Sequence, residues 1–371
     1  MLLVVLYYFL FFFIYWRNRN IKDIDIARIK QLVIIAFLLL FIFFGFRDIT
    51  VLCDTPHYYS SLRDKIEIRN SISWYYFNLL NRFEPGYQIF ESIHAKLFKN
   101  PYSIIISSAF IISVGTVCFY KKMNKSGLFL CLFLLLNYQL LNQYSAIRQG
   151  IATIILYYAI INMIEGNFSK YILASLLACT FHITAVVSFL LYPLKYIKFN
   201  KKTMVLFIVA FFVITTSLLK PLIEMFATDS LYADTNADRE SFPIGSAILF
   251  SMSAFLFLRA RRYFTRFKAI EVNNTLWLIC CICLLLQAID IVFPIVGRVA
   301  MYFVPFLISV FVSCLRSIPD VNYRNNQTIV ILFIFFGWFI IYNALKPEWY
   351  YLYPYSFMDF DKIFTGYEID R

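Results

Sequence analysis

Arginine, histidine and carboxylate side chains stand inside or beside apolar stretches of this sequence, where a charged group is costly to keep. Ionisable residues in such places are functional candidates by default, since arginine binds anions and histidine or a carboxylate transfers protons. His182 stands out because "LACTFHITAVVSF" at 177–189 is apolar enough to be membrane-embedded. The other candidates are Arg47, Asp54, Tyr58, Glu84, Tyr87, Arg148, Gln149, Asp290, Arg298 and Tyr302.

The composition indicates that membrane-spanning helices must position these residues. Of the 371 residues, 61% are hydrophobic and only 15% are charged, which a water-soluble domain rarely shows. Apolar runs approaching the roughly 20 residues needed to cross a bilayer recur along the chain. We therefore predict an all-α, polytopic integral membrane protein that forms one domain over residues 1–371.

The basic residues orient the predicted spans. The net charge of +12 does not indicate nucleic acid, because the lysines and arginines lie in short clusters between apolar runs, as in cytoplasmic loops. With these clusters inside, about ten transmembrane helices alternate from an outside N-terminus, leaving 46–100 and 221–243 as the main external segments. The basic clusters are 17–30, 121–125, 195–202, 259–268 and 316–324. The expected spans are about 1–16, 31–46, 101–120, 127–142, 148–164, 203–219, 244–258, 275–293, 298–315 and 327–345.

Residues 171–194 do not fit this alternation as a single crossing, because one crossing would place the basic 195–202 segment outside. A re-entrant hairpin resolves the conflict, with half-length helices at about 171–181 and 184–194 and "FHIT" at its tip. Each arm would reach about 17 Å into the bilayer. A broken segment at that depth must be enclosed by protein or by a water-filled cavity. We expect His182 at the tip, in one outward-facing cavity with the other candidates.

Each candidate also has a structural interpretation. An arginine at a helix end commonly snorkels to the membrane interface. Arg148 and Arg298, however, lie at expected outer ends, where positive charge is disfavoured. Asp290 could form a structural ion pair with Arg298, and His182 could merely hold the bent tip through a hydrogen bond.

Four further motifs carry weaker signals. "EWYYLYPYSF" at 348–357 fits an interfacial aromatic belt better than a sugar-stacking platform. "YQIFESIHAKLF" at 87–98 fits an amphipathic segment on the outer surface. "CCIC" at 280–283 has no histidine or carboxylate at metal spacing, so no metal site is predicted. The apolar run at 1–16 lacks a basic flank and a cleavage site, and is expected to be a retained span.

Taken in order, these landmarks resemble the Wzy-like EpsG family of bacterial polysaccharide polymerases over nearly the whole chain. The family pattern is an early arginine and aspartate followed by tyrosine, then Glu-x-Gly-Tyr, Arg-Gln, Phe-His-x-Ser/Thr, a later arginine and a late Pro-Tyr. The matching residues are Arg47, Asp54, Tyr58, Glu84, Gly86, Tyr87, Arg148, Gln149, Phe181, His182, Thr184, Arg298, Pro354 and Tyr355. One departure is Leu52, because the family usually has glycine two residues before the first aspartate.

The resemblance implies a glycosyltransferase that joins lipid-linked oligosaccharide repeats, for O-antigen, capsule or exopolysaccharide, on the outer face of the cytoplasmic membrane. Polyprenyl-pyrophosphate-linked oligosaccharide would be both donor and acceptor, alongside membrane lipid, a chain-length regulator and a flippase. A pyrophosphate leaving group needs positive charge more than a proton, so no metal or other cofactor is required.

The resemblance also implies roles for the candidates. Arg148 and Arg298 are the expected clamp on the pyrophosphate. His182 is the first choice for the general base, with Glu84 or Asp54 second. The remaining expected ligands of the glycan or pyrophosphate are Arg47, Gln149, Tyr58, Tyr87, Asp290 and Tyr302.

Other function classes stay open at this point. Intramembrane charge and a re-entrant hairpin also occur in transporters and lipid flippases, although polar groups biased to one face and the absence of repeated halves argue against them. A ligase that moves the finished glycan to another acceptor shares the same chemistry. An acyltransferase with His182 as base would leave the outer arginines unexplained.

Overall fold

The computed structural model describes most of the chain as helix. The described residues are 2–19, 26–68, 83–98, 100–200, 202–203, 205–206, 209, 244–267, 272–291, 293, 295–345, 351–352 and 355–359. Across these ranges the only strand-like pairing is an isolated antiparallel bridge between Arg47 and Phe357. The chain divides into two compact units, Met1–Leu190 with Asn325–Arg371, and Leu191–Arg324. The all-α class is confirmed, and the single membrane domain stays a prediction.

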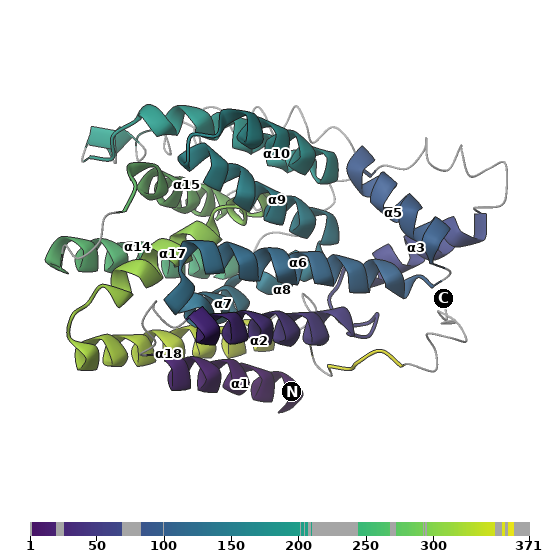
Figure 1. Cartoon of the computed structure of the whole chain (residues 1–371), viewed down its shortest axis with the longest axis horizontal. Coiled ribbons are helices and arrows are strands. Elements are labelled where there is room, and N and C mark those ends of the chain that lie inside the picture. The colour runs from purple at the N-terminus through teal and green to yellow at the C-terminus, as the bar shows by residue number, and fades with distance from the viewer. Residues whose placement is uncertain are drawn as a thin grey trace. The chain divides into compact units, whose positions relative to one another are not determined.

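In the first unit, four helices lie side by side in a row (Figure 1). Helix α2 (Ile26–Gly45) packs on α6 (Tyr102–Met123), α6 on α9 (Ile147–Ile164), and α9 on α10 (Phe168–Phe181). The same unit contains α1 (Leu2–Asn18), α3 (Thr55–Ile68), α5 (Pro85–Leu97), η1 (Lys125–Gly127), α7 (Leu128–Tyr138) and α8 (Leu140–Ser145). Two helices cross the boundary between the units, η2 (Ile183–Tyr196) and α18 (Val321–Leu345).

Four of the described helices are long and apolar enough to cross a membrane. They are α2, α6, α9 and the part of α18 from Val321 to Ala344. Shorter apolar helices accompany them, so the chain has the character of an integral membrane protein, but the predicted count of ten crossings is not confirmed. The predicted span 127–142 divides at Gln139, whose backbone is not helical (φ −151°, ψ 1°). The predicted span 203–219 lies almost wholly outside the described residues, and the external segment 221–243 entirely so.

The second unit is built from α14 (Ile244–Phe267), α15 (Asn274–Asp290), α16 (Ile295–Ala300) and α17 (Val304–Arg316). Helix α14 packs on both α15 and α17. The sequence predicted a loop at 259–268, but α14 continues to Phe267. This basic stretch stays helical because arginine is a good helix former and no glycine or proline interrupts it. The predicted span 298–315 is divided between α16 and α17.

In helix α5 the polar side is buried and the apolar side is exposed, the reverse of a surface helix in water. Helix α5 starts where Pro85 occupies the first turn, a position that suits a residue without an N–H. Glu91 and His94 are buried, whereas Ile89 and Leu97 are 62% and 70% exposed. The predicted amphipathic segment is therefore a helix, but its polar side packs against α3 and α6.

The end of the chain packs onto the end of α2. Asp48 N donates to Ser356 O at 3.0 Å, and Met358 N donates to Phe46 O at 2.9 Å. Tyr355 is buried, stacked on Phe43 with ring centroids 4.3 Å apart. The described part of the predicted aromatic belt therefore packs on the residues that follow α2. Pro354 lies outside the described residues.

Candidate functional site

Most of the predicted site residues of the first unit gather where α3, α5, α9 and α10 meet. Glu84 precedes α5 and Arg148 is the second residue of α9. The Arg148 Nη1 group forms an ion pair with Glu84 Oε2, and its guanidinium lies 4.5 Å from the centroid of the Phe83 ring. The two charged side chains are 23% and 15% exposed, so the pair is largely enclosed but still within reach of a ligand.

Tyr58 holds the other side of this guanidinium. Arg148 donates a hydrogen bond to the Tyr58 side chain. Burial raises the pKa of Tyr58 above its ordinary value, so the phenol stays neutral beside the cation. Its ring packs edge-on against Tyr87 with centroids 5.6 Å apart. Two of the predicted tyrosines therefore belong to this cluster, although both are buried.

The helix breaks at His182, where the sequence predicts the hairpin tip. Helix α10 ends at Phe181, and His182 has an extended backbone (φ −155°, ψ 121°) before η2 begins. Tyr171 of α10 donates a hydrogen bond to the carbonyl of Ser188 in η2, which shows that the second arm folds back along the first. The imidazole Nδ1 of His182 lies 2.7 Å from Thr184 Oγ1. The position of this hairpin in a membrane stays a prediction.

Glu84 links the ion pair to the helix break. Its Oε1 atom accepts a hydrogen bond at 3.2 Å from Ile183 N, the first backbone donor of η2. The first N–H groups of a helix lack intrahelical partners, and a carboxylate suits that positive end. One side chain thus contacts both Arg148 and the residue next to His182. This contact could not be predicted from the sequence, because Ile183 contributes only its backbone N–H.

A close approach between α5 and α10 keeps this geometry tight. A Cβ atom at Gly86 would lie 2.3 Å from Thr180 Oγ1 and 2.8 Å from the Thr180 carbonyl oxygen. Only glycine allows that separation. The Glu-x-Gly-Tyr motif therefore has a packing reason for its glycine.

Asp54 lies at the edge of the same cluster, on a turn docked onto the end of α8. Its backbone N donates to Ser145 Oγ at 3.3 Å, and its carboxylate is close enough to raise the pKa of Tyr58, a smaller effect than burial. Leu52 has φ 68°, in the left-handed region that favours glycine. The turn before Asp54 thus keeps the conformation that the family's glycine suits, with leucine in its place.

Arg47 does not face this cluster, and its role as a substrate ligand stays a prediction. Its side chain is 0% exposed, so no ligand reaches it in this structure. It donates to Phe44 O, to Tyr144 O at 3.0 Å and to Thr55 Oγ1 at 3.2 Å. The two carbonyls belong to the last turns of α2 and α8, where a cation offsets the negative helix ends. Burial lowers the pKa of Arg47 to about 10, which leaves it charged at neutral pH.

Gln149 follows Arg148 in α9 but is buried within the helices. The remaining predicted residues belong to the second unit. Asp290 is buried and accepts a hydrogen bond at 2.9 Å from Gly297 N, so it holds the start of α16. Tyr302 is fully buried, whereas Arg298 is exposed.

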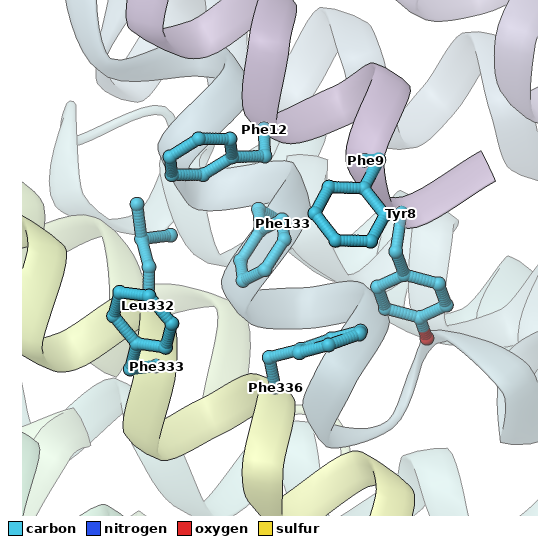
Figure 2. A pocket seen from close by; sticks show the side chains of 7 residues that line it. All are labelled: Tyr8, Phe9, Phe12, Phe133, Leu332, Phe333 and Phe336. Atoms are coloured by element: carbon cyan, nitrogen blue, oxygen red, sulfur yellow. The ribbon is translucent and has the colours of Figure 1, made fainter. Parts of the chain in front are cut away.

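A separate groove on the first unit has no groups for chemistry (Figure 2). Aromatic and leucine side chains of α1, α7 and α18 line it, and it encloses about 110 Å³. None of the residues around Glu84 and Arg148 lines this groove. Across the described ranges, no group of three or more His, Cys, Asp or Glu residues is arranged to hold a metal ion.

Comparison with known proteins supports the resemblance to this family. The model of the EpsG family matches residues 30–357, which include both the Glu84–Arg148 cluster and Arg298. No curated protein and no solved structure matches the chain significantly. Because the match covers most of the sequence, the chain belongs to the EpsG family.

Proposed function

We propose that this protein is a polysaccharide polymerase, a glycosyltransferase that joins polyprenyl-pyrophosphate-linked repeats on the outer face of the bacterial cytoplasmic membrane. Family membership supports the polymerase class, and the long apolar helices support an integral membrane protein. The observation that carries the proposal is the contact of Glu84 with both Arg148 and the helix break beside His182. A flippase would deliver the donor, and a chain-length regulator would act on the product.

Arg148 binds the pyrophosphate of the donor in this proposal. Its planar guanidinium can donate two parallel hydrogen bonds to phosphate oxygens, which lysine cannot do. Its Nε atom has no hydrogen-bond partner in the described part of the chain, whereas the Nη groups contact Glu84 and Tyr58. The Glu84 carboxylate and the Phe83 ring hold the guanidinium in place before the donor arrives. Preorganised charge of this kind lowers the barrier to departure of an anionic group.

His182 acts as the general base. The acceptor hydroxyl oxygen attacks the anomeric carbon of the donor while its proton passes to His182. The bond from that carbon to the pyrophosphate breaks, and the pyrophosphate leaves with the bonding electrons. Glu84 fixes the position of His182 relative to Arg148, since it contacts both Arg148 and Ile183, the residue after His182. Arg298 stays a predicted phosphate ligand of the second unit.

The test is glycan laddering in a cell that lacks this gene, complemented at matched membrane abundance. We expect wild type to restore long chains. Arg148→Lys keeps the charge but loses the planar fork, and should slow extension about 10²-fold. His182→Gln should slow it about 10²–10⁴-fold, the usual contribution of a general base. Lys122→Met is the matched control, because its ion pair with Glu165 is exposed (47% and 43%).

The outcomes separate the function classes. Single lipid-linked repeats that accumulate on the outer face in the His182 and Arg148 variants support polymerisation at this site. Repeats trapped on the inner face would indicate a flippase. Long chains from both variants would indicate that His182 has only a structural role, at the bend of the helix. Arg298→Ala in the same assay decides whether the second unit contributes a phosphate ligand.

A further inference from the structure

A buried ion pair joins α3 to α5 away from the residues that the proposed reaction uses. Lys65 Nζ lies 2.8 Å from Glu91 Oε2, and both side chains are 0% exposed. Ser61 Oγ donates to the other carboxylate oxygen, Glu91 Oε1, at 2.5 Å. Each oxygen of this carboxylate is therefore bound from α3.

The ion pair lies on the same helix faces as the site. Tyr58, Ser61 and Lys65 follow one another at spacings of three and four residues along α3, which places them on one face. Tyr87 and Glu91 have the same four-residue spacing along α5, which begins directly after Glu84. The charge of Glu91 also raises the pKa of Tyr87, a smaller effect than burial. One end of this shared face thus carries the site, and Lys65 with Glu91 lies about two helical turns away.

Helix α5 has a second polar anchor, to α6. His94 Nε2 lies 2.7 Å from Ser107 Oγ, and His94 Nδ1 donates to Phe90 O at 2.7 Å. The Ser107 contact fixes where α5 sits against α6, and the Phe90 contact holds the imidazole within α5; neither reaches α3. Glu91, through its hydrogen bond from Ser61 and its ion pair with Lys65, joins α5 to α3.

We propose that Lys65 and Glu91 are positioning residues that set the register of α5 against α3, and so place Glu84 and the tip at His182 relative to Tyr58. This inference rests on the proposed function. A buried ion pair is weak as a source of stability, because desolvation of the two charges offsets their attraction. Its directional contact nevertheless fixes one residue of α5 to one residue of α3. An apolar pair would fill the same space without choosing a register.

The two kinetic constants should respond differently to loss of this pair. Arg148 lies on α9, and its hydrogen bond with Tyr58 of α3 would still hold the guanidinium if α5 slipped, so donor binding should persist. Glu84 directly precedes α5, so a slip of α5 would move it and the tip that it contacts. Misplacement of a reacting group by about 1 Å can cost about 10²-fold in rate. We expect the donor KM to stay within about threefold and kcat to fall at least about tenfold.

The test variant is Lys65→Met with Glu91→Met, which replaces both charges by side chains of similar volume. Such replacements are often neutral or stabilising, so the variant should fold. The matched control is Lys122→Met with Glu165→Met, which removes an exposed ion pair of the same unit. Rates are measured in membranes with lipid-linked repeats extracted from the cell lacking this gene, per amount of folded protein. Folded protein is quantified by size-exclusion and thermal melting.

The positioning role is supported if kcat falls at unchanged donor KM in the Lys65/Glu91 variant. The Lys122/Glu165 control variant should keep the kcat of wild type. Wild-type kcat per folded protein in the Lys65/Glu91 variant would overturn the positioning role and leave the pair a packing feature. If the Met pair does not fold, Lys65→Gln with Glu91→Gln replaces it under the same criteria. Failure of both neutral pairs to fold would make the ion pair a folding determinant and would also overturn the proposal. Absence of polymerisation by wild type would instead refute the proposed function itself.

Discussion

Replacement of Gly86 by alanine should damage the site through close contacts with Thr180. The added Cβ would lie 2.8 Å from the Thr180 carbonyl oxygen and 2.3 Å from its Oγ1. The hydroxyl can rotate away, but the Thr180 carbonyl oxygen and the Thr180 Cβ atom, which is also 2.8 Å from the added Cβ, belong to α10 and cannot. Moving from 2.8 Å to an ordinary contact of 3.4 Å requires α5 and α10 to separate by about 0.6 Å. Overpacking of this kind costs about 1–3 kcal/mol of stability.

The same displacement should reach the reaction, because Gly86 is two residues from Glu84. A misplacement of about 1 Å can cost about 10²-fold in rate, so a shift of about 0.6 Å predicts a loss of about tenfold. Polymerisation rate per folded protein and thermal melting of the purified protein measure the two effects. Gly337→Ala is the control, since a Cβ there meets nothing within 4 Å.

A second substitution tests which atom of Thr180 causes the loss. Thr180→Ala removes Oγ1 but leaves the carbonyl oxygen in place, so adding it to Gly86→Ala should restore only part of the activity. Full restoration would place the conflict in the hydroxyl group. Wild-type rate and melting in Gly86→Ala alone would refute the close approach and the packing reason for this glycine.

Three further predictions concern other parts of the chain. Leu52→Gly should be more stable than Leu52→Ala by about 1 kcal/mol, because both lose the buried side chain but only glycine relieves φ 68°; the reverse order in thermal melting would contradict this strain. Burial lowers the pKa of His94, so its contribution to stability is present above about pH 6.5 and lost as the pH falls through the folded pKa. His94→Gln should therefore show a smaller fall in melting temperature between pH 7 and pH 5 than wild type does. An equal fall in both proteins would refute the assignment to His94. Gly297→Ala should destabilise the second unit by about 1–3 kcal/mol, because its Cβ would lie 2.3 Å from Asp290 Oδ1; unchanged proteolysis of that unit would count against it.

The sequence predicted the members of the main cluster because their types are costly beside apolar segments. Glu84, Arg148 and Tyr58 lie far apart in the chain, yet each stands at or near the start of a helix. A helix start suits the Glu84 carboxylate but not the Arg148 cation, which is held there by Glu84 and Tyr58. The break at His182 was predictable from the charge conflict that a single crossing would create. These residues come together if the ends of their helices lie on the same side of the protein.

The sequence could not separate Arg47 from Arg148, because both are arginines beside an apolar helix. What distinguishes them is tertiary packing, since the last turns of α2 and α8 supply carbonyls for Arg47 whereas α5 supplies a carboxylate for Arg148. The count of ten crossings is not confirmed, for a related reason. Hydropathy averages over a whole run, but the break at Gln139 depends on the backbone dihedral angles of that one residue.

Helix α5 shows how the setting changes the meaning of an amphipathic pattern. In water, the charged side of such a helix is expected to be solvated, and Glu91 would need no partner. Here the apolar side is the exposed one, with Ile89, Ile93 and Leu97 outward, and Glu91 is 0% exposed. A buried carboxylate must be paired, so the pattern itself predicts a cation on a neighbouring element. Lys65 meets that need from 26 residues away. The charged side of a helix beside apolar spans therefore predicts contacts inside the protein. The partner of opposite charge on a neighbouring helix then helps to fix how the two helices are placed.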